Sequence, residues 1–387
     1  MKIVQVVPYF FPAWSYGGPA KLVYDMSTYF SQQGHQVTVL TSNAFDTQGV
    51  MPESKKIYSA KNLKVVYYSL LSNWLASKTK VYITPSFYFN FFSYLRQAEI
   101  VHLHDFFTLQ NAFVALICWT LNKPYIVSPH GTLQDKAVFQ KTWFKKTFMN
   151  LVGYRVLKKA RRVLVSSQEE SRVMVKLGVD KNKIIQIGHG VNISEVTSKI
   201  GKSQSRRKLQ LPQQKIIVTF LGRLSQLKGL DMLLKIIESS QNNDVYFVIA
   251  GSDDGYLETI KNSKSKNFKL MGVCFGEEKA MLFRASDIFI YPSYSEGFSV
   301  GILEAAGAGL PLIITQGCNF DQVQQAEAGL VVEANLKSLK SALTKLTADQ
   351  RLRQKMSTNA RHLIENKFST KIINHQLLDI YGNCLTN

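Results

Sequence analysis

Residues 287–315 read DIFIYPSYSEGFSVGILEAAGAGLPLIIT and contain two short apolar segments separated by a helix-compatible segment. Strands are expected at 288–291 and 312–314, with a helix at 300–309 between them. Apolar strands that are joined through a helix are typical of a β-α-β unit, in which the parallel strands are covered on both faces. This stretch therefore predicts an α/β protein with a parallel sheet.

The loop after the first of these strands is a candidate binding site. It places Glu296 and Gly297 at the carboxyl end of a strand, where open α/β sheets bind their ligands. The expected helix then offers free backbone N–H groups at Ser299 and Val300, which suit a phosphate group. Glu304 lies further along the same helix. The alternative is that Glu296 and Glu304 are ordinary surface carboxylates near a helix start.

This combination resembles a known signature. Glu296-Gly297-Phe298 followed by Glu304 is similar to the E-x7-E motif of retaining glycosyltransferases of family 4. The resemblance implies the GT-B fold, in which two Rossmann-like, doubly wound domains face a central crevice. It also implies that Glu304 accepts hydrogen bonds from ribose hydroxyls, and that Glu296 and the amides of Gly297 and Phe298 orient sugar hydroxyls.

A second segment strengthens the resemblance. Residues 222–229 read GRLSQLKG and resemble the G-R-L-x-x-x-K-G motif of the same family. The resemblance implies that Arg223 binds the nucleotide diphosphate as a two-pronged donor and that Lys228 binds it as a point charge. Each basic residue alone is also compatible with a solvated side chain.

Three weaker matches complete the predicted site. An H-G pair at His130 resembles the family's active-site histidine beside the donor sugar, and Val273 lies in a segment similar to one beside the nucleotide base. Gly17 and Gly18 precede a predicted helix where the family has a glycine pair near the donor diphosphate. The alternatives are a plain turn for the glycines and a loop histidine for His130.

The length of 387 residues exceeds what one hydrophobic core normally supports, so two domains are expected. The N-terminal acceptor-binding domain is predicted at residues 1–190 and the nucleotide-sugar domain at residues 214–368. The polar and basic residues 191–213 are predicted to be a linker. The resemblance implies that the last helix, residues 369–387, crosses back to the first domain.

Metal and disulfide chemistry are not expected. His102 and His104 share one face of a predicted strand, but no further ligand lies near them in the sequence. Asp253 and Asp254 are adjacent and do not form the D-x-D metal motif of the other transferase fold. The four cysteines contain no C-x-x-C pair, which fits a reducing compartment. We expect no cofactor, and the nucleotide sugar acts as co-substrate.

The net charge of +20 is concentrated in the first half of the chain, where residues 1–200 hold 24 Lys and Arg against 10 Asp and Glu. Residues 136–168 contain nine basic residues and no acidic one. This asymmetry predicts an anionic partner, either a membrane surface or a nucleic acid, although a solvated basic face is the ordinary interpretation. The aromatic residues at 86–96 are interpreted as core packing or as a lipid contact.

The resemblance therefore implies a retaining hexosyltransferase that moves a sugar from a UDP- or GDP-sugar to an acceptor hydroxyl. The acceptor is expected to be a lipid-linked saccharide in polysaccharide or lipopolysaccharide synthesis. No signal peptide or membrane span is expected, so the protein is predicted to be cytoplasmic and peripheral on the inner face of the membrane. The alternatives are a sugar-nucleotide epimerase and a basic nucleic-acid-binding protein. No nucleic-acid motif is found, so no nucleic-acid partner is expected.

Overall fold

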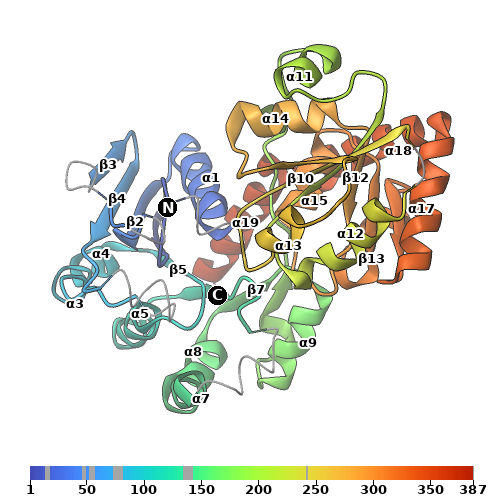
Figure 1. Ribbon diagram of the computed structural model, residues 1–387. Coiled ribbons are helices and arrows are strands. Elements are labelled where there is room, and N and C mark those ends of the chain that lie inside the picture. Colours follow the sequence, from blue (N-terminus) through green and yellow to red (C-terminus); the bar gives the residue numbers. More distant parts are fainter. Residues whose placement is uncertain are drawn as a thin grey trace. The chain divides into compact units, whose positions relative to one another are not determined.

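The computed structural model describes residues 1–13, 18–45, 49–51, 57–72, 82–133, 143–240 and 243–386. The chain forms two compact units, one of residues 1–189 with 373–387 and the other of residues 190–372. Many of the elements of each unit are labelled in Figure 1.

The first unit is built on an eight-stranded sheet with the order β3-β4-β2-β1-β5-β6-β7-β8. Every neighbouring pair is parallel except β3 with β4, which is antiparallel. The strands are β1 (Lys2–Val6), β2 (Gln36–Ser42), β3 (Ile57–Ala60), β4 (Leu63–Tyr68), β5 (Ile100–His104), β6 (Tyr125–Ser128), β7 (Arg162–Val165) and β8 (Ile184–Gln186). The helices are α1 (Gly18–Gln32), α3 (Phe87–Asn90), α4 (Phe92–Gln97), α5 (Leu109–Thr120), α7 (Trp143–Phe148), the π-helix η3 (Met149–Gly153), α8 (Tyr154–Lys159), α9 (Gln168–Lys176) and the short η4 (Lys181–Lys183).

The second unit contains a six-stranded, fully parallel sheet with the order β11-β10-β9-β12-β13-β14. Its strands are β9 (Ile216–Leu221), β10 (Val245–Ala250), β11 (Phe268–Met271), β12 (Ile288–Tyr291), β13 (Leu312–Thr315) and β14 (Gly329–Val332). Its helices are α10 (Ile193–Val196), α11 (Lys202–Lys208), η5 (Gln226–Lys228), α12 (Leu230–Glu238), α13 (Leu257–Lys261), α14 (Gly276–Ala285), α15 (Val300–Gly307), η6 (Gln316–Cys318), α16 (Gln322–Gln325), α17 (Leu336–Ala348), α18 (Gln350–Leu363) and η7 (Ile364–Phe368).

The β-α-β unit predicted from residues 287–315 is confirmed as β12, α15 and β13. All four residues of β12 and all four of β13 are buried, and the two strands pair in parallel. Continuous burial is what a central parallel strand requires, because helices cover both of its faces. The two Rossmann-like, doubly wound units of the predicted fold are therefore present.

Residues 191–213, which were expected to be a linker, carry α10 and α11 and belong to the second unit. Arg206 explains why this segment is held. Its guanidinium is 5% exposed and donates to the Asp287 carboxylate at 2.6 Å, and it also donates to the carbonyl groups of Ala285 and Gln213. Asp287 also accepts from Lys202 at 2.5 Å and from the N–H of Ile217 at 2.7 Å. The basic residues that suggested a solvated linker thus anchor the segment to the start of β12.

The last helix, α19 (Thr370–Thr386), begins in the second unit, and its residues from Ile373 onward belong to the first. Tyr381 is fully buried there, with its ring 5.5 Å from that of Phe30.

The aromatic-rich segment 86–96 contains two short helices, α3 and α4. Phe87 and Phe91 stack with ring centroids 4.7 Å apart and lie in the core, whereas Phe92 is exposed. Core packing therefore accounts for these two aromatic residues.

We expect Asp287→Asn to lower the free energy of unfolding by about 3 kcal/mol, because it leaves the buried Arg206 guanidinium without its counter-charge. Urea-induced unfolding would measure the change. The matched control is Glu327→Gln, which removes an exposed ion pair with Lys355 and should change the free energy of unfolding much less than Asp287→Asn, because water screens an exposed pair. Equal effects of the two substitutions would contradict the anchoring role of Asp287.

Candidate functional site

The second unit brings Lys228 and Glu296 together at the carboxyl ends of β9 and β12. Their side chains form an ion pair and are only 8% and 10% exposed. Lys228 reaches this place because Gly229 adopts a left-handed conformation with φ of +70°, and a Cβ there would lie 2.0 Å from the Pro292 carbonyl oxygen. A glycine is therefore required for the η5 turn to approach the loop after β12.

Two neighbouring loops hold Glu296 in position. The Tyr291 hydroxyl donates to its carboxylate at 2.8 Å. The Glu296 N–H donates to the Gly317 carbonyl at 2.8 Å, and the Asn319 side-chain amide donates to the Glu296 carbonyl at 2.8 Å. Burial, followed by the nearby Glu296 carboxylate, raises the pKa of Tyr291 well above its usual value. Tyr291 therefore stays protonated and acts as a fixed donor to Glu296.

The start of α15 lies at the end of β9. Ser299 caps this helix without a side-chain hydrogen bond to its backbone, and Val300 is its first residue. A Cβ on Gly301 would lie 3.0 Å from the Leu221 carbonyl oxygen, so a glycine allows the helix to approach β9 closely. The Ser299 side chain also acts on Tyr291, where it partly offsets the rise in the pKa of the tyrosine. The helix start, Tyr291 and Glu296 therefore form one connected group.

Glu304 is paired with a residue that the sequence reasoning did not single out. The Lys279 ammonium, on α14, lies 2.6 Å from the Glu304 carboxylate, and both side chains are mostly buried. The sequence offers no signal for this ion pair, because a single lysine near the start of the helix before β12 does not indicate which carboxylate it contacts. Tyr291 and Asn319 were missed for the same reason.

Arg223 has different surroundings from Lys228. Its guanidinium is 60% exposed and lies 2.7 Å from the Asp254 carboxylate, which is also exposed. A surface pair of this kind is weakly held. Arg223 is therefore available to an incoming anion, whereas Lys228 is already fixed by Glu296.

The other predicted donor-site residues are distributed as follows. Val273 is 46% exposed in the loop after β11, and Gly297 precedes Phe298 in the loop before α15. The Phe298 ring packs against Phe320 at 5.4 Å, so its side chain supports the loop. Gly18 is the first residue of α1 in the other unit, and Gly17 lies outside the described residues.

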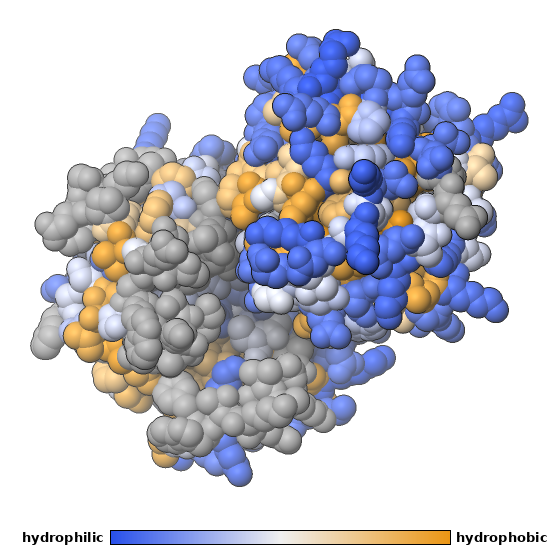
Figure 2. Space-filling model, viewed as in Figure 1, coloured by the Kyte–Doolittle hydropathy of each residue, from blue (hydrophilic) through white to orange (hydrophobic). Residues whose placement is uncertain are grey.

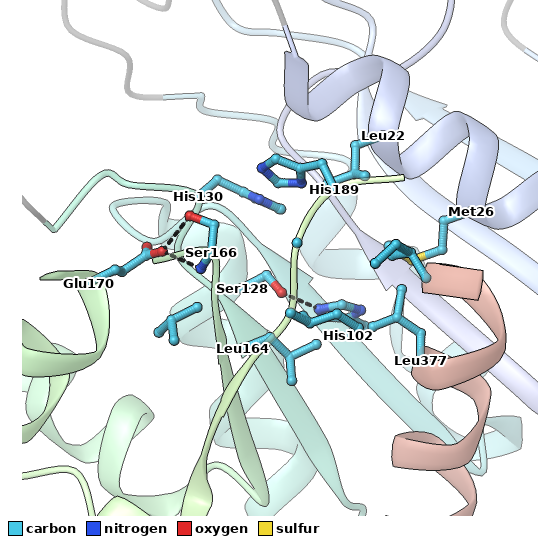
Figure 3. A pocket seen from close by; sticks show the side chains of 14 residues that line it. Leu22, Met26, His102, Ser128, His130, Leu164, Ser166, Glu170, His189 and Leu377 are labelled. Carbon is cyan, nitrogen blue, oxygen red and sulfur yellow. Dashed lines mark hydrogen bonds between the residues drawn. The ribbon is translucent and has the colours of Figure 1, made fainter. Parts of the chain in front are cut away.

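The first unit has a small cavity of about 30 Å³, lined by both polar and apolar side chains. Figure 3 shows its lining, which comes from the ends of β5, β6, β7 and β8 and from α1 and α19. His102, Ser128, His130 and His189 contribute its polar groups beside apolar side chains such as Leu377. A volume of this size accommodates one or two waters. The cavity alone is therefore too small for a sugar.

The histidines at this cavity are joined by hydrogen bonds. His102 Nδ1 lies 2.5 Å from the Tyr381 hydroxyl, and its Nε2 lies 2.7 Å from Ser128 Oγ. His104 Nδ1 lies 3.0 Å from His130 Nε2. Burial, reinforced by neighbouring histidines, lowers the pKa of His102, His104 and His130 well below the usual value. Burial also lowers the pKa of His189 to about 4. These four rings are therefore neutral near pH 7.

Glu170 fixes the loop that carries His130. It is fully buried on α9 and accepts from the Gly131 N–H at 2.8 Å and from the N–H and hydroxyl of Ser166 at 2.8 and 2.9 Å. His130 has φ of +51°, a left-handed conformation that histidine adopts more readily than most residues. The carboxylate thus stabilises an unusual turn, and the His130 ring stays only half-buried.

No group of three or more His, Cys, Asp or Glu side chains suited to a metal occurs among the described residues. His102 and His104 are hydrogen-bonded to protein side chains. In the part of the chain that the structure describes, no helix is long and apolar enough to cross a bilayer.

Comparison with known proteins identifies the family. The model of Glycosyltransferase Family 4 matches residues 16–195, and that of Glycosyl transferases group 1 matches residues 201–363. The Escherichia coli UDP-Gal:alpha-D-GlcNAc-diphosphoundecaprenol alpha-1,3-galactosyltransferase is 31% identical over 242 residues, which are 58% of this chain and 61% of that protein.

Solved structures show the same fold. Anabaena Alr3699/HepE in complex with UDP and glucose has a TM-score of 0.79 at 16% identity, covering 99% of this chain and all of that one. WaaG, a glycosyltransferase involved in lipopolysaccharide biosynthesis, has a TM-score of 0.70 at 15% identity, covering 98% and 99%. The chain therefore belongs to the group 1, family 4 glycosyltransferases and has their GT-B fold.

Proposed function

We propose that the protein transfers a sugar from a nucleoside-diphosphate sugar to an acceptor hydroxyl with retention of configuration and without a metal ion. The observation that carries this proposal is the buried Lys228–Glu296 pair beside the start of α15. This arrangement combines a fixed cation, a fixed carboxylate and free helix N–H groups, which are the groups needed to bind a diphosphate and orient a sugar.

Four groups of the second unit are proposed to stabilise the leaving diphosphate. As the glycosidic bond breaks, negative charge develops on the leaving diphosphate. Lys228, Arg223 and the amides of Ser299 and Val300 stabilise that charge, and their fixed positions favour the transition state over the ground state. A diphosphate oxygen then takes the acceptor proton on the same face of the sugar, so no protein nucleophile is required.

The remaining donor contacts concern the sugar and the nucleoside. Glu296 and the amides of Gly297 and Phe298 orient sugar hydroxyls, and Glu304, held by Lys279, accepts hydrogen bonds from the ribose. Between uridine and guanosine, uridine is supported by the galactosyltransferase, which is named for UDP-Gal, and by HepE, whose structure is a complex with UDP and glucose. We therefore propose a UDP-sugar as the donor, with a GDP-sugar as the alternative.

A lipid-linked saccharide is the proposed acceptor. The galactosyltransferase is named for a diphosphoundecaprenol acceptor, and WaaG is described as acting in lipopolysaccharide biosynthesis. We accordingly place the protein in the synthesis of a surface polysaccharide or lipopolysaccharide, at the inner face of the cell membrane.

A surface of the first unit supports this placement. Along the continuous α7, η3 and α8 segment, Lys146, Arg155, Lys158 and Lys159 are exposed, and Leu151 is 68% exposed among them. α5, which contacts α8, adds exposed Phe113 and Leu116. Figure 2 shows hydrophobic residues at the visible surface around α5, whereas the visible face of the second unit is largely hydrophilic. Basic side chains around exposed apolar ones are suited to an anionic bilayer surface. Lys136 and Lys141 of the basic segment lie outside the described residues.

Nucleotide binding tests the donor. Near 100 times its dissociation constant, the correct nucleotide should stabilise the protein by roughly 2.7 kcal/mol, which a thermal-shift assay with UDP, GDP and ADP would detect. Glu304→Gln should weaken this shift, because it removes the charge that accepts from the ribose. The control Glu327→Gln changes an exposed carboxylate on another surface and should leave the shift intact. No shift with any nucleotide would contradict the proposal.

Turnover tests the anion-stabilising groups. Arg223→Ala should lower the release of nucleoside diphosphate from the donor sugar nucleotide on the order of 10²–10³-fold, as removal of one transition-state donor does. Because Arg223 is exposed and weakly paired, this variant should unfold at the same urea concentration as the wild type. Lys355→Ala, which also removes an exposed basic residue of this unit, is the control. Near-normal turnover of Arg223→Ala would refute its assignment.

Membrane attachment is tested by co-sedimentation with vesicles. The protein should bind vesicles of anionic phospholipid at moderate salt and dissociate as salt rises, since each basic residue at the surface contributes about 1 kcal/mol. The variant Lys146→Gln, Arg155→Gln, Lys158→Gln should bind much less than the wild type. Its control is Lys235→Gln, Lys261→Gln, Lys355→Gln, with the same charge change in the second unit. Equal binding by both variants would rule out the α7–α8 surface.

A further inference from the structure

A line of hydrogen bonds runs from the centre of the first sheet to His130. Gln5, in the middle of β1, is fully buried, and its Oε1 lies 2.6 Å from His104 Nε2. The other nitrogen of His104, Nδ1, lies 3.0 Å from His130 Nε2. Gln5 and His104 are fully buried, whereas His130 is half-buried. The line of hydrogen bonds therefore connects the interior of the sheet to a partly exposed residue at its edge.

The orientation of the Gln5 amide determines which atoms donate and which accept along this line of hydrogen bonds. Its Nε2 donates to the Tyr381 hydroxyl at 3.3 Å and also faces the Met26 sulfur at 3.5 Å. Its oxygen consequently faces His104 and can only accept. His104 must then carry a hydrogen on Nε2, because an amide oxygen and a bare imidazole nitrogen would otherwise meet at 2.6 Å.

The tautomer of His130 follows from that of His104. Burial keeps His104 neutral, as the lowered pKa indicates, so a ring with hydrogen on Nε2 has a bare Nδ1. That nitrogen accepts at 3.0 Å, and His130 Nε2–H must be the donor. In neutral His130 the Nδ1 atom is then a bare acceptor. Among the described residues, nothing hydrogen-bonds to it.

We propose that Gln5 and His104 are positioning residues that hold His130 in the Nε2–H tautomer, so that its Nδ1 accepts a hydrogen bond from a substrate hydroxyl. This inference rests on the proposed function, in which the substrates are sugars. A sugar hydroxyl can donate to Nδ1 and still accept elsewhere. The opposite tautomer would present N–H at this position and would change which hydroxyl pattern the site accepts.

The C-terminal helix also contacts this Gln5–His104–His130 hydrogen-bond line, which we call the relay. Its Tyr381 hydroxyl helps to orient the Gln5 amide. The Tyr381 hydroxyl accepts from Gln5 Nε2 at 3.3 Å and lies 2.5 Å from His102 Nδ1, and His102 Nε2 lies 2.7 Å from Ser128 Oγ. Without that hydroxyl, the Gln5 amide nitrogen would lose a hydrogen-bond partner, and the orientation of the amide would be less firmly fixed. Tyr381→Phe should therefore give His130 a mixture of tautomers.

The direct test is nitrogen NMR on protein labelled with ¹⁵N-histidine, in which protonated and bare ring nitrogens resonate at distinct positions. The His130 signals are identified by their loss in His130→Gln. Wild type should show a protonated Nε2 and a bare Nδ1, and Gln5→Met should lose this preference. Gln110→Met is the matched control, because Gln110 is an equally buried glutamine that donates to Thr84 outside the relay. It should leave the His130 signals unchanged.

Two substitutions at His104 separate positioning from packing. Asparagine places an acceptor near the position of Nδ1, whereas glutamine reaches towards the position of Nε2 and away from His130. We expect His104→Gln to lower the turnover of the sugar nucleotide by roughly 10- to 100-fold, as loss of a buried hydrogen-bond partner does. His104→Asn should retain more of the activity. Urea unfolding of both variants shows whether they are folded to the same extent.

The outcomes are distinguishable. A bare Nε2 on His130 in the wild type, or no change in Gln5→Met, overturns the relay whatever the turnover. Equal activity of the two His104 variants, when they are equally stable, also overturns it. If His130 has the expected tautomer but no sugar nucleotide is turned over, the relay stands and the proposed function fails.

Discussion

The parallel pairing of the strands is the constraint on which both candidate sites depend. Parallel strands all end at the same edge of their sheet, so the loops that follow them must meet there. In the second unit this edge joins Lys228, after β9, to Glu296, after β12. In the first unit it joins His104, at the end of β5, to His130, after β6. Residues far apart in the sequence become partners without any local signal that links them.

Parallel sheets are buried on both faces, and this makes any polar residue within them costly unless it is bonded. The buried polar side chains of this protein meet this requirement because each makes several hydrogen bonds. Asp287 accepts from Lys202, Arg206 and a backbone N–H, and Gln5 bonds both to His104 and to Tyr381. The same bonds that compensate burial also fix orientation. In the first unit, the requirement for buried hydrogen bonds thereby determines the tautomer of a histidine near the surface.

The sequence predicted the fold well where local pattern and burial agree, as in residues 287–315, where strand, helix and strand are each evident. It failed for residues 191–213, because a basic segment looks solvated until its buried counter-charge, Asp287, is known. Among the candidate site residues, Glu296, Lys228 and Glu304 belong to spaced motifs and could be named. Lys279, Tyr291 and Gln5 could not, because each acts through a partner on another strand or helix. Pairings of this kind arise from the tertiary structure.

The two buried lysines of the second unit also constrain how the site can act. Lys228 and Lys279 each lie against a carboxylate, so each pair is close to neutral. Net positive charge at Lys228 and Lys279 is therefore not the main attraction for an anionic ligand. The exposed Arg223, which is only weakly held by Asp254, and the N–H groups at the start of α15 supply accessible positive charge, while the paired lysines supply fixed donors in a protected place. Stabilisation of a diphosphate in this site would therefore depend on how firmly the groups are held, which is the role of Tyr291, Asn319 and Gly229.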